Sequence, residues 1–165
     1  MKALRLILVS ALLLLSGCGF HLRGDINLPV GLQQMHVQGA AKNTAIGLEL
    51  RRSLETSGVN IVNEASAAQV ILKISPPAFE RRLLSVSGVS GKTAEYELIY
   101  TLDVSLQDRQ GKILLAPQKL RQLRDYTYDA NNVLGKGDEQ YRLQADMERD
   151  MVRQILNRLQ AYNRG

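Results

Sequence analysis

The sequence predicts an α+β domain in which two helices pack on one face of a mostly antiparallel sheet of about four strands. Residues 93–107 alternate apolar and polar side chains, which is typical of a strand with one buried face. Short segments rich in turn residues separate this stretch from extended stretches on both sides. Two further segments repeat apolar residues at every fourth position, as amphipathic helices do. Helices that cover one face of such a sheet form an α+β sandwich.

The first 17 residues have the pattern of a secretory signal peptide. Lys2 and Arg5 precede an apolar run at 6–15, and two small residues follow it. The run is shorter than the roughly 20 residues that a membrane-spanning helix needs. Cys18, the only cysteine of the chain, comes next. This order resembles a bacterial lipobox, in which the cysteine is acylated and the chain is cut just before it. The alternative is an ordinary signal peptide followed by a chance cysteine.

Lipidation of Cys18 would divide the chain into three segments. We expect residues 1–17 to be removed, residues 18–30 to form a lipidated tether, and residues 31–165 to form a single domain. Two or more acyl chains anchor a protein stably to a membrane. Gly19 at the next position favours the outer membrane over retention in the inner membrane. With Cys18 acylated, disulfides play no part.

The charge balance is only mildly basic. The formal net charge is +5 at pH 7, and Lys2 and Arg5 of the signal segment supply two of these charges. This is too little to favour a nucleic-acid partner, and the periplasmic compartment argues against one as well.

The predicted elements of the first half follow from local signals. A short strand at 35–38 precedes Asn43 or Thr44, either of which can cap a helix that runs to about Ser57. Gly58 stands where a glycine often ends a helix. Residues 70–74 form the next strand.

The second half reads as an antiparallel meander followed by a helix. Pro76-Pro77 cannot lie inside a paired central strand, so they mark a break before an extended stretch at 79–86. After the strand at 93–107, a further extended run covers 112–128, where Pro117 indicates a bulge. Asp138 then opens a long amphipathic helix that ends near Tyr162.

Catalytic and metal-binding motifs are absent from the sequence, so we expect neither an enzyme nor a cofactor or metal site. His21 lies in the tether, and His36 is best read as a half-buried sheet residue. The serines at 85–90 lack the spacing of a nucleophile elbow. One strand face carries three carboxylates, which favour a solvated or partner-facing surface over an acid–base pair: Glu95, Glu97 and Asp103.

Basic residues are the more suggestive polar group. Lys136 lies between two glycines in a predicted loop before the last helix, where an ammonium can reach a phosphate. Lys92 lies at the tip of the predicted hairpin just before the strand at 93–107. Arg81 and Arg82 form a basic pair, and further basic residues crowd the last hairpin: Arg109, Lys112, Lys119, Arg121 and Arg124. Ordinary solubilising charge remains the alternative. Arg121 and Arg124 lie on opposite faces of a regular strand.

Several motifs together resemble the LptE family of lipopolysaccharide (LPS)-assembly lipoproteins. Cys18-Gly19-Phe20-His21-Leu22-Arg23-Gly24 is similar to the start of a mature member of that family. Thr93-Ala94-Glu95-Tyr96 resembles the start of its central strand. Leu134-Gly135-Lys136, followed by Asp138-Glu139 and by Asp150-Met151-Val152, also fits. The resemblance spans essentially the whole mature chain.

The resemblance implies a function that composition alone does not. It predicts an outer-membrane lipoprotein that plugs the lumen of the β-barrel LptD and helps to insert LPS into the outer leaflet. It also implies LPS binding through a basic residue that matches Lys136. A second basic position of the family corresponds here to Val89, and Lys92 is close enough to substitute for it.

Two other function classes stay open. The chain could be a different outer-membrane biogenesis lipoprotein, an accessory of barrel assembly or a peptidoglycan binder, or it could be a periplasmic hydrolase. The missing nucleophile and base argue against the hydrolase.

Overall fold

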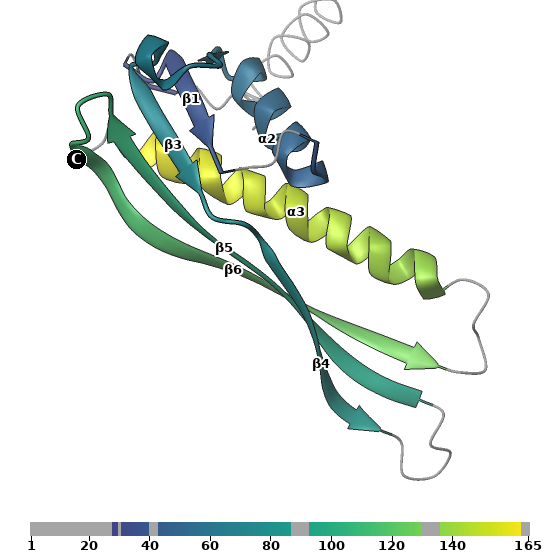
Figure 1. Cartoon of the computed structure of the whole chain (residues 1–165). Coiled ribbons are helices and arrows are strands. Elements are labelled where there is room, and N and C mark those ends of the chain that lie inside the picture. The colour runs from purple at the N-terminus through teal and green to yellow at the C-terminus, as the bar shows by residue number, and fades with distance from the viewer. Residues whose placement is uncertain (1–27, 30, 40–42, 87–92, 130–135, 163–165) are drawn as a thin grey trace, which may run out of the picture.

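The chain folds into a long curled sheet with two helices on one of its faces (Figure 1). This computed structural model describes residues 28–29, 31–39, 43–86, 93–129 and 136–162, except for the side chains of residues 93, 129 and 136–138. The helices are α2 (Ala45–Thr56) and α3 (Lys136–Ala161), and a 3-10 turn, η1, covers Ala65–Ala67. The strands are β1 (Gln34–Gln38), β2 (Asn60–Ile61), β3 (Val70–Ile74), β4 (Ala78–Val86), β5 (Thr93–Asp108) and β6 (Ile113–Asp129).

The α+β class is confirmed, with a larger and more mixed sheet than predicted. Within the described residues the sheet has six strands in place of about four. β5 pairs antiparallel with β3, β4 and β6, whereas β1 pairs parallel with both β2 and β3. The parallel pairs arise because α2 carries the chain back across the sheet between β1 and β2, and parallel neighbours need such a crossover. The two-residue strand β2 was too short to predict from periodicity.

β3 and β4 follow one another along the same edge of β5. β3 pairs with residues 104–108 of β5, and β4 pairs with residues 94–101. Between them, the Ser75 amide donates to the Asp103 carbonyl at 2.9 Å, and the Asp103 amide donates to the Ser75 hydroxyl at 2.8 Å. Pro76 and Pro77 have no amide hydrogen to continue the ladder. The predicted break at these prolines is therefore confirmed.

The predicted bulge at Pro117 is also confirmed. Val104 of β5 pairs with Gln118 of β6, whereas Leu106 pairs with Leu115, so β6 holds one extra residue over this step. Proline is tolerated at such a site because the extra residue is left unpaired.

Both helices begin and end near their predicted residues. Thr44 caps α2, because its hydroxyl accepts a hydrogen bond from the Gly47 amide at 3.2 Å. Gly58 follows α2 with a φ of 82°, a conformation that favours glycine. α3 begins at Lys136, two residues earlier than predicted. The expectation that Lys136 lies in a loop before the helix is therefore wrong, since its backbone already belongs to α3.

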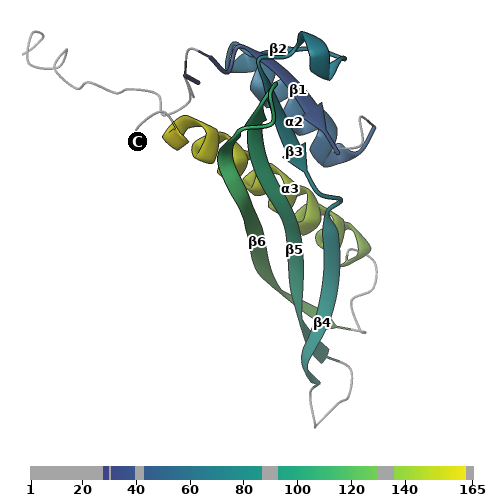
Figure 2. The ribbon, with the colours of Figure 1, turned by 60° about the vertical axis from the view of Figure 1, so that its left-hand side comes forward.

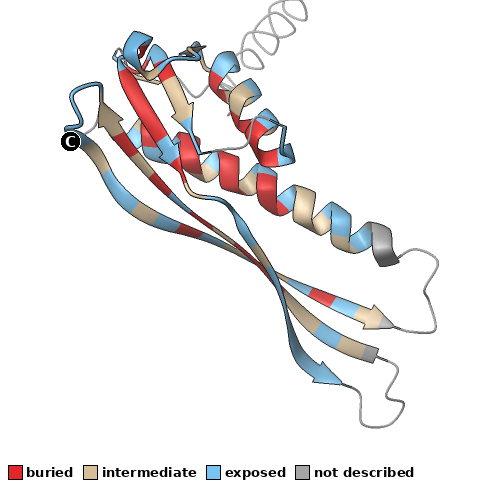
Figure 3. Cartoon of the chain, in the orientation of Figure 1, coloured by how far each residue is buried: buried red, intermediate tan, exposed pale blue. Residues whose placement is uncertain are grey.

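The apolar core lies between the helices and one face of the sheet. Even-numbered residues of β5 from Leu98 to Leu106 are buried against α2 and α3, as the alternation predicts. Figure 3 shows that buried residues concentrate where both helices cover the sheet, and that the far end of the strands is largely exposed. We call residues 81–86, 93–97, 125–129 and 136–146 the distal end, and the remaining described residues the proximal part.

Candidate functional surface at the distal end

The distal end contains the start of α3, where the predicted LPS contact Lys136 lies. Lys92, Val89 and the predicted lipid anchor Cys18 lie outside the described residues. The chain direction sets this arrangement. β5 runs away from the distal end and β6 returns to it, and α3 then runs back along the same face (Figure 2). The structure thus brings the backbone of Lys136 to the end of the sheet where β4 ends and β5 begins.

Arg81 joins β4 to the first turns of α3. Its guanidinium carbon lies 4.7 Å from the centroid of the Tyr96 ring on β5, within the range of a cation–π contact. Its Nη1 donates to the Oε1 of Gln140 at 3.2 Å. Tyr96 in turn stacks with Tyr126 of β6, with ring centroids 6.3 Å apart. Sequence reasoning missed this cluster because Arg81 and Gln140 are 59 residues apart and neither belongs to a motif.

Arg82 makes a different contact on the other face of the sheet. Its Nη2 lies 2.5 Å from the Oε2 of Glu97, and the Ser85 hydroxyl donates to Glu95 at 2.8 Å. Neighbouring residues of a strand point to opposite faces, so the two adjacent arginines serve separate surfaces. Glu97 is an ion-pair partner of Arg82 here.

Tyr126 is the one buried residue of the distal end among the side chains that the structure describes. It keeps 4% of its surface exposed. Burial and the nearby Glu139 carboxylate raise the pKa of Tyr126, while the positive charge of Arg81 opposes that shift. Tyr126 thus remains a neutral phenol at physiological pH, and its ring supports Tyr96.

Exposed apolar side chains gather at the end of β4. Leu83, Leu84 and Val86 are 53%, 49% and 51% exposed. The register of β4 against β5 shifts between Leu83 and Ser85, so a bulge at Leu84 interrupts the regular alternation. On α3, Tyr141 is 72% exposed. The distal end therefore offers an amphipathic surface.

The basic residues of the last hairpin do not form one patch. Arg109 and Lys112 lie at the β5–β6 turn, at the opposite end of the sheet from Lys136. Lys119 and Arg121 are exposed, whereas Arg124 reaches Asp150 of α3. The predicted placement of Arg121 and Arg124 on opposite faces is thus confirmed.

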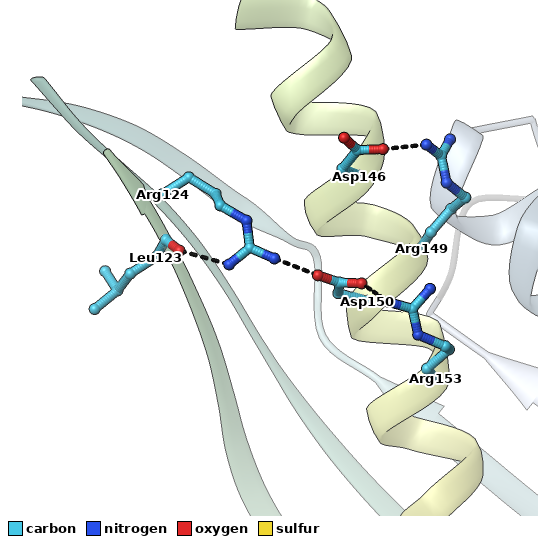
Figure 4. A network of polar contacts seen from close by, with 6 residues as sticks. All are labelled: Leu123, Arg124, Asp146, Arg149, Asp150 and Arg153. Carbon is cyan, nitrogen blue, oxygen red and sulfur yellow. Dashed lines mark hydrogen bonds and ion pairs between the residues drawn. The ribbon is translucent and has the colours of Figure 1, made fainter. Parts of the chain in front are cut away.

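The Arg124–Asp150 pair anchors β6 to α3, and Figure 4 shows it from close by. The two carboxylate oxygens of Asp150 accept from different arginines, Arg124 on the strand and Arg153 on the helix. The Asp150 side chain is only 18% exposed. In the same view Asp146 pairs with Arg149, and both of these side chains are about half exposed, at 50% and 53%.

A second polar contact lies inside the proximal core. The Tyr100 hydroxyl donates a hydrogen bond to Glu148 of α3, which also accepts from the Gln144 amide at 3.1 Å. Burial, together with the negative charge of Glu148 and this hydrogen bond, raises the pKa of Tyr100 far above its usual range. This pair therefore holds β5 and α3 together with a neutral tyrosine.

The described residues also bear on metal binding and membrane spanning. No group of three or more histidine, cysteine, aspartate or glutamate side chains in this part of the chain could hold a metal ion. Neither α2 nor α3 has the length and apolar character needed to span a bilayer. His36 lies on β1 with its Nδ1 3.2 Å from the Val62 carbonyl, which fits its reading as a sheet residue.

Known proteins share both the sequence pattern and the fold. Residues 32–159 match the LptE family, described as lipopolysaccharide-assembly. A relative from Pectobacterium atrosepticum, named LPS-assembly lipoprotein LptE, is 27% identical over 164 residues, which cover 96% of this chain and 85% of the relative. The solution structure of an uncharacterized lipoprotein B from Nitrosomonas europaea is similar with a TM-score of 0.73 and 31% identity, covering 89% of this chain and 94% of that chain.

A crystal structure of another lipoprotein also shares this fold. The rare lipoprotein B from Shewanella oneidensis is similar with a TM-score of 0.68 and 25% identity, covering 79% of this chain and 96% of that chain. The family match covers the sheet and nearly all of both helices. This chain belongs to the LptE family of lipopolysaccharide-assembly lipoproteins.

Proposed function

We propose that this protein is an outer-membrane lipoprotein that plugs the LptD β-barrel and assists the insertion of LPS into the outer leaflet. The observation that carries the proposal is the family match over residues 32–159, together with the name of its relatives. The open face of the sheet supports it as well. That face carries Glu97, Asp103 and Arg121, a polar character that suits the polar lumen of a barrel. The role is non-enzymatic.

The partner is tested by affinity purification of the full chain from outer membranes. LptD should accompany it as a single large barrel in a stoichiometric amount. Recovery of a barrel-assembly complex or of peptidoglycan fragments, with no LptD, would instead support a different biogenesis lipoprotein and contradict this proposal.

We propose that acylated Cys18 anchors the protein to the periplasmic face of the outer membrane. The signal segment at 1–17 would be removed, and residues 18–30 would link the lipid to the domain. Replacement of Cys18 behind a cleavable signal should release the protein from the membrane while the domain still folds. If the barrel encloses the domain, part of the function should survive this change.

For LPS, we propose a contact through Lys136, with Lys92 as a second cation. Lipid A carries phosphates, and an ammonium is a compact point charge that pairs with them. Each exposed ion pair contributes only about 0.2–1 kcal/mol. Several such contacts together could still disturb the packing of LPS aggregates.

Lys136→Asp tests the contact. We expect LPS to bind about fivefold more weakly, which corresponds to about 1 kcal/mol. Arg109→Asp is the matched control, because it makes the same charge reversal at the other end of the sheet and should leave binding unchanged. Equal binding by the wild type and the Lys136 variant would contradict this role of Lys136.

A further inference from the structure

The structure assigns Arg81 as a positioning residue that docks the first turns of α3 on the strands and thereby sets the place of Lys136. This inference rests on the proposed LPS contact at Lys136 and adds a residue that touches no ligand itself. Arg81 belongs to β4, whereas Lys136 begins α3, and Gln140 follows Lys136 by one helical turn. Holding Gln140 therefore limits where the first turn of α3 can lie.

The first turns of α3 have little apolar burial to hold them. Among the side chains that the structure describes, the buried residues of α3 begin at Met147. Before it, Tyr141 points largely into solvent and Leu143 is only partly buried. Helix ends fray when packing does not hold them, because most helical stability in proteins comes from tertiary contacts. The start of α3 thus depends on polar contacts.

Arg81 supplies a polar contact between β4 and the start of α3. Its guanidinium lies over the Tyr96 ring at 4.7 Å and donates to Gln140 at 3.2 Å. A planar guanidinium can stack on an aromatic face and donate hydrogen bonds at its edge at the same time. Tyr126, which is buried, fixes Tyr96 by stacking against it. The arginine is therefore held by β5 while it reaches to α3.

Charges around Arg81 fit a positioning role. Both partners of its guanidinium, the Tyr96 ring and the Gln140 amide, are neutral. Arg81 and Glu139 of α3 both act electrostatically on Tyr126, with opposite effects on its pKa, so the two charges lie near the same ring. Arg82, by contrast, is paired with Glu97 on the other face and has no described contact with α3. Arg82 is therefore the natural control.

The docking is tested by a distance measurement on the full lipidated chain. Leu84→Cys on β4 and Tyr141→Cys on α3 are exposed positions for spin labels. Cys18 carries lipid under the proposed function, so these are the free thiols that react. We expect Arg81→Ala and Gln140→Ala each to broaden and lengthen the distance between the two labels. Arg82→Ala should leave the distance unchanged.

LPS binding is measured on the same variants without labels. We expect Arg81→Ala to weaken binding about fivefold, the loss expected from one cation–π contact with a hydrogen bond. Arg81→Lys should rescue binding in part, because it keeps the cation over Tyr96 but lacks the planar edge that meets Gln140. A purely structural role would instead lower the melting temperature alone and leave the label distance at low temperature unchanged.

The outcomes separate this inference from the proposed function. An unchanged label distance in Arg81→Ala and Gln140→Ala would overturn the docking role. A changed distance with unaltered LPS binding would overturn the link between docking and binding. If Lys136→Asp alone fails to weaken LPS binding, the proposed contact at Lys136 is wrong even where the distance changes confirm the docking.

Discussion

The proximal part and the distal end of this domain are built from different interactions. Proximal residues from both helices and from four strands bury an apolar core that includes Met35, Leu50, Leu72 and Ile155 with 1% exposure or less. At the distal end, Tyr126 is the one buried side chain among those described. The described contacts of the distal end include a hydrogen bond from Arg81 to Gln140 and the stacked rings of Tyr96 and Tyr126.

This difference places most of the stability in the proximal part. Burial of apolar area is the main favourable term in folding, so most of the folding free energy arises in the proximal part. The distal end keeps Leu83, Leu84 and Tyr141 exposed and also contains the start of α3 at Lys136, and these exposed side chains contribute little to stability.

The largest expected effect comes from truncating the proximal core. Leu72 has 0% exposure on β3, so Leu72→Ala should lower the free energy of unfolding by about 2–5 kcal/mol. Leu84→Ala at the distal end, where the side chain is 49% exposed, should change it by less than about 0.5 kcal/mol. Urea unfolding of both variants checks the contrast. Similar losses would contradict the division into two parts.

The ion pairs of α3 offer a smaller contrast. Asp150→Asn weakens the partly buried contact with Arg124, and we expect a loss of about 1–2 kcal/mol in unfolding free energy. Asp146→Asn removes the charge from an exposed pair with Arg149 and should cost about 0.5 kcal/mol or less. Thermal or urea denaturation can resolve the two values. A larger loss for Asp146→Asn would show that the strand contact of Asp150 adds nothing.

A third expected effect is a pH dependence of stability that arises from Tyr100. Its folded-state pKa is raised by burial and by Glu148, so the folded protein keeps the phenol protonated above about pH 10, where the unfolded chain releases the proton. Stability from this group is therefore complete below pH 10 and is lost as the pH rises further. Tyr100→Phe should cost about 1 kcal/mol at pH 7, because the hydrogen bond to Glu148 is lost, and should flatten the alkaline decline.

Unfolding at pH 7 and at pH 10.5 measures both effects of that change. Tyr141→Phe serves as the control, since the Tyr141 side chain is 72% exposed. An equally steep alkaline decline in Tyr100→Phe would assign the pH dependence to other groups.

Much of the proximal part could be predicted from the sequence because local signals determine it. The alternation at 93–107 predicts the buried face of β5, and Thr44 and Gly58 mark the ends of α2. Pro76-Pro77 and Pro117 predict the breaks because proline lacks an amide hydrogen. Each of these features depends on a few neighbouring residues.

The parallel strands and the distal contacts could not be predicted in the same way. β1 pairs with β3 through residues more than thirty positions apart, and no local pattern distinguishes that pairing from an antiparallel one. Arg81, Tyr96 and Gln140 meet only because β4, β5 and α3 converge. Residue type alone made Arg81 and Arg82 look equivalent, whereas the alternation of the strand sends them to different partners.

Hydrogen exchange of the full chain with and without LPS tests the central claim most directly. Without LPS, amides of β3 and of residues 104–106 should exchange only through global unfolding, whereas those of residues 139–143 should exchange through local opening. Addition of LPS should slow exchange at the start of α3 and leave β3 unchanged. Slowing confined to the proximal turn at 108–112, or equal protection of both parts before LPS is added, would contradict the account.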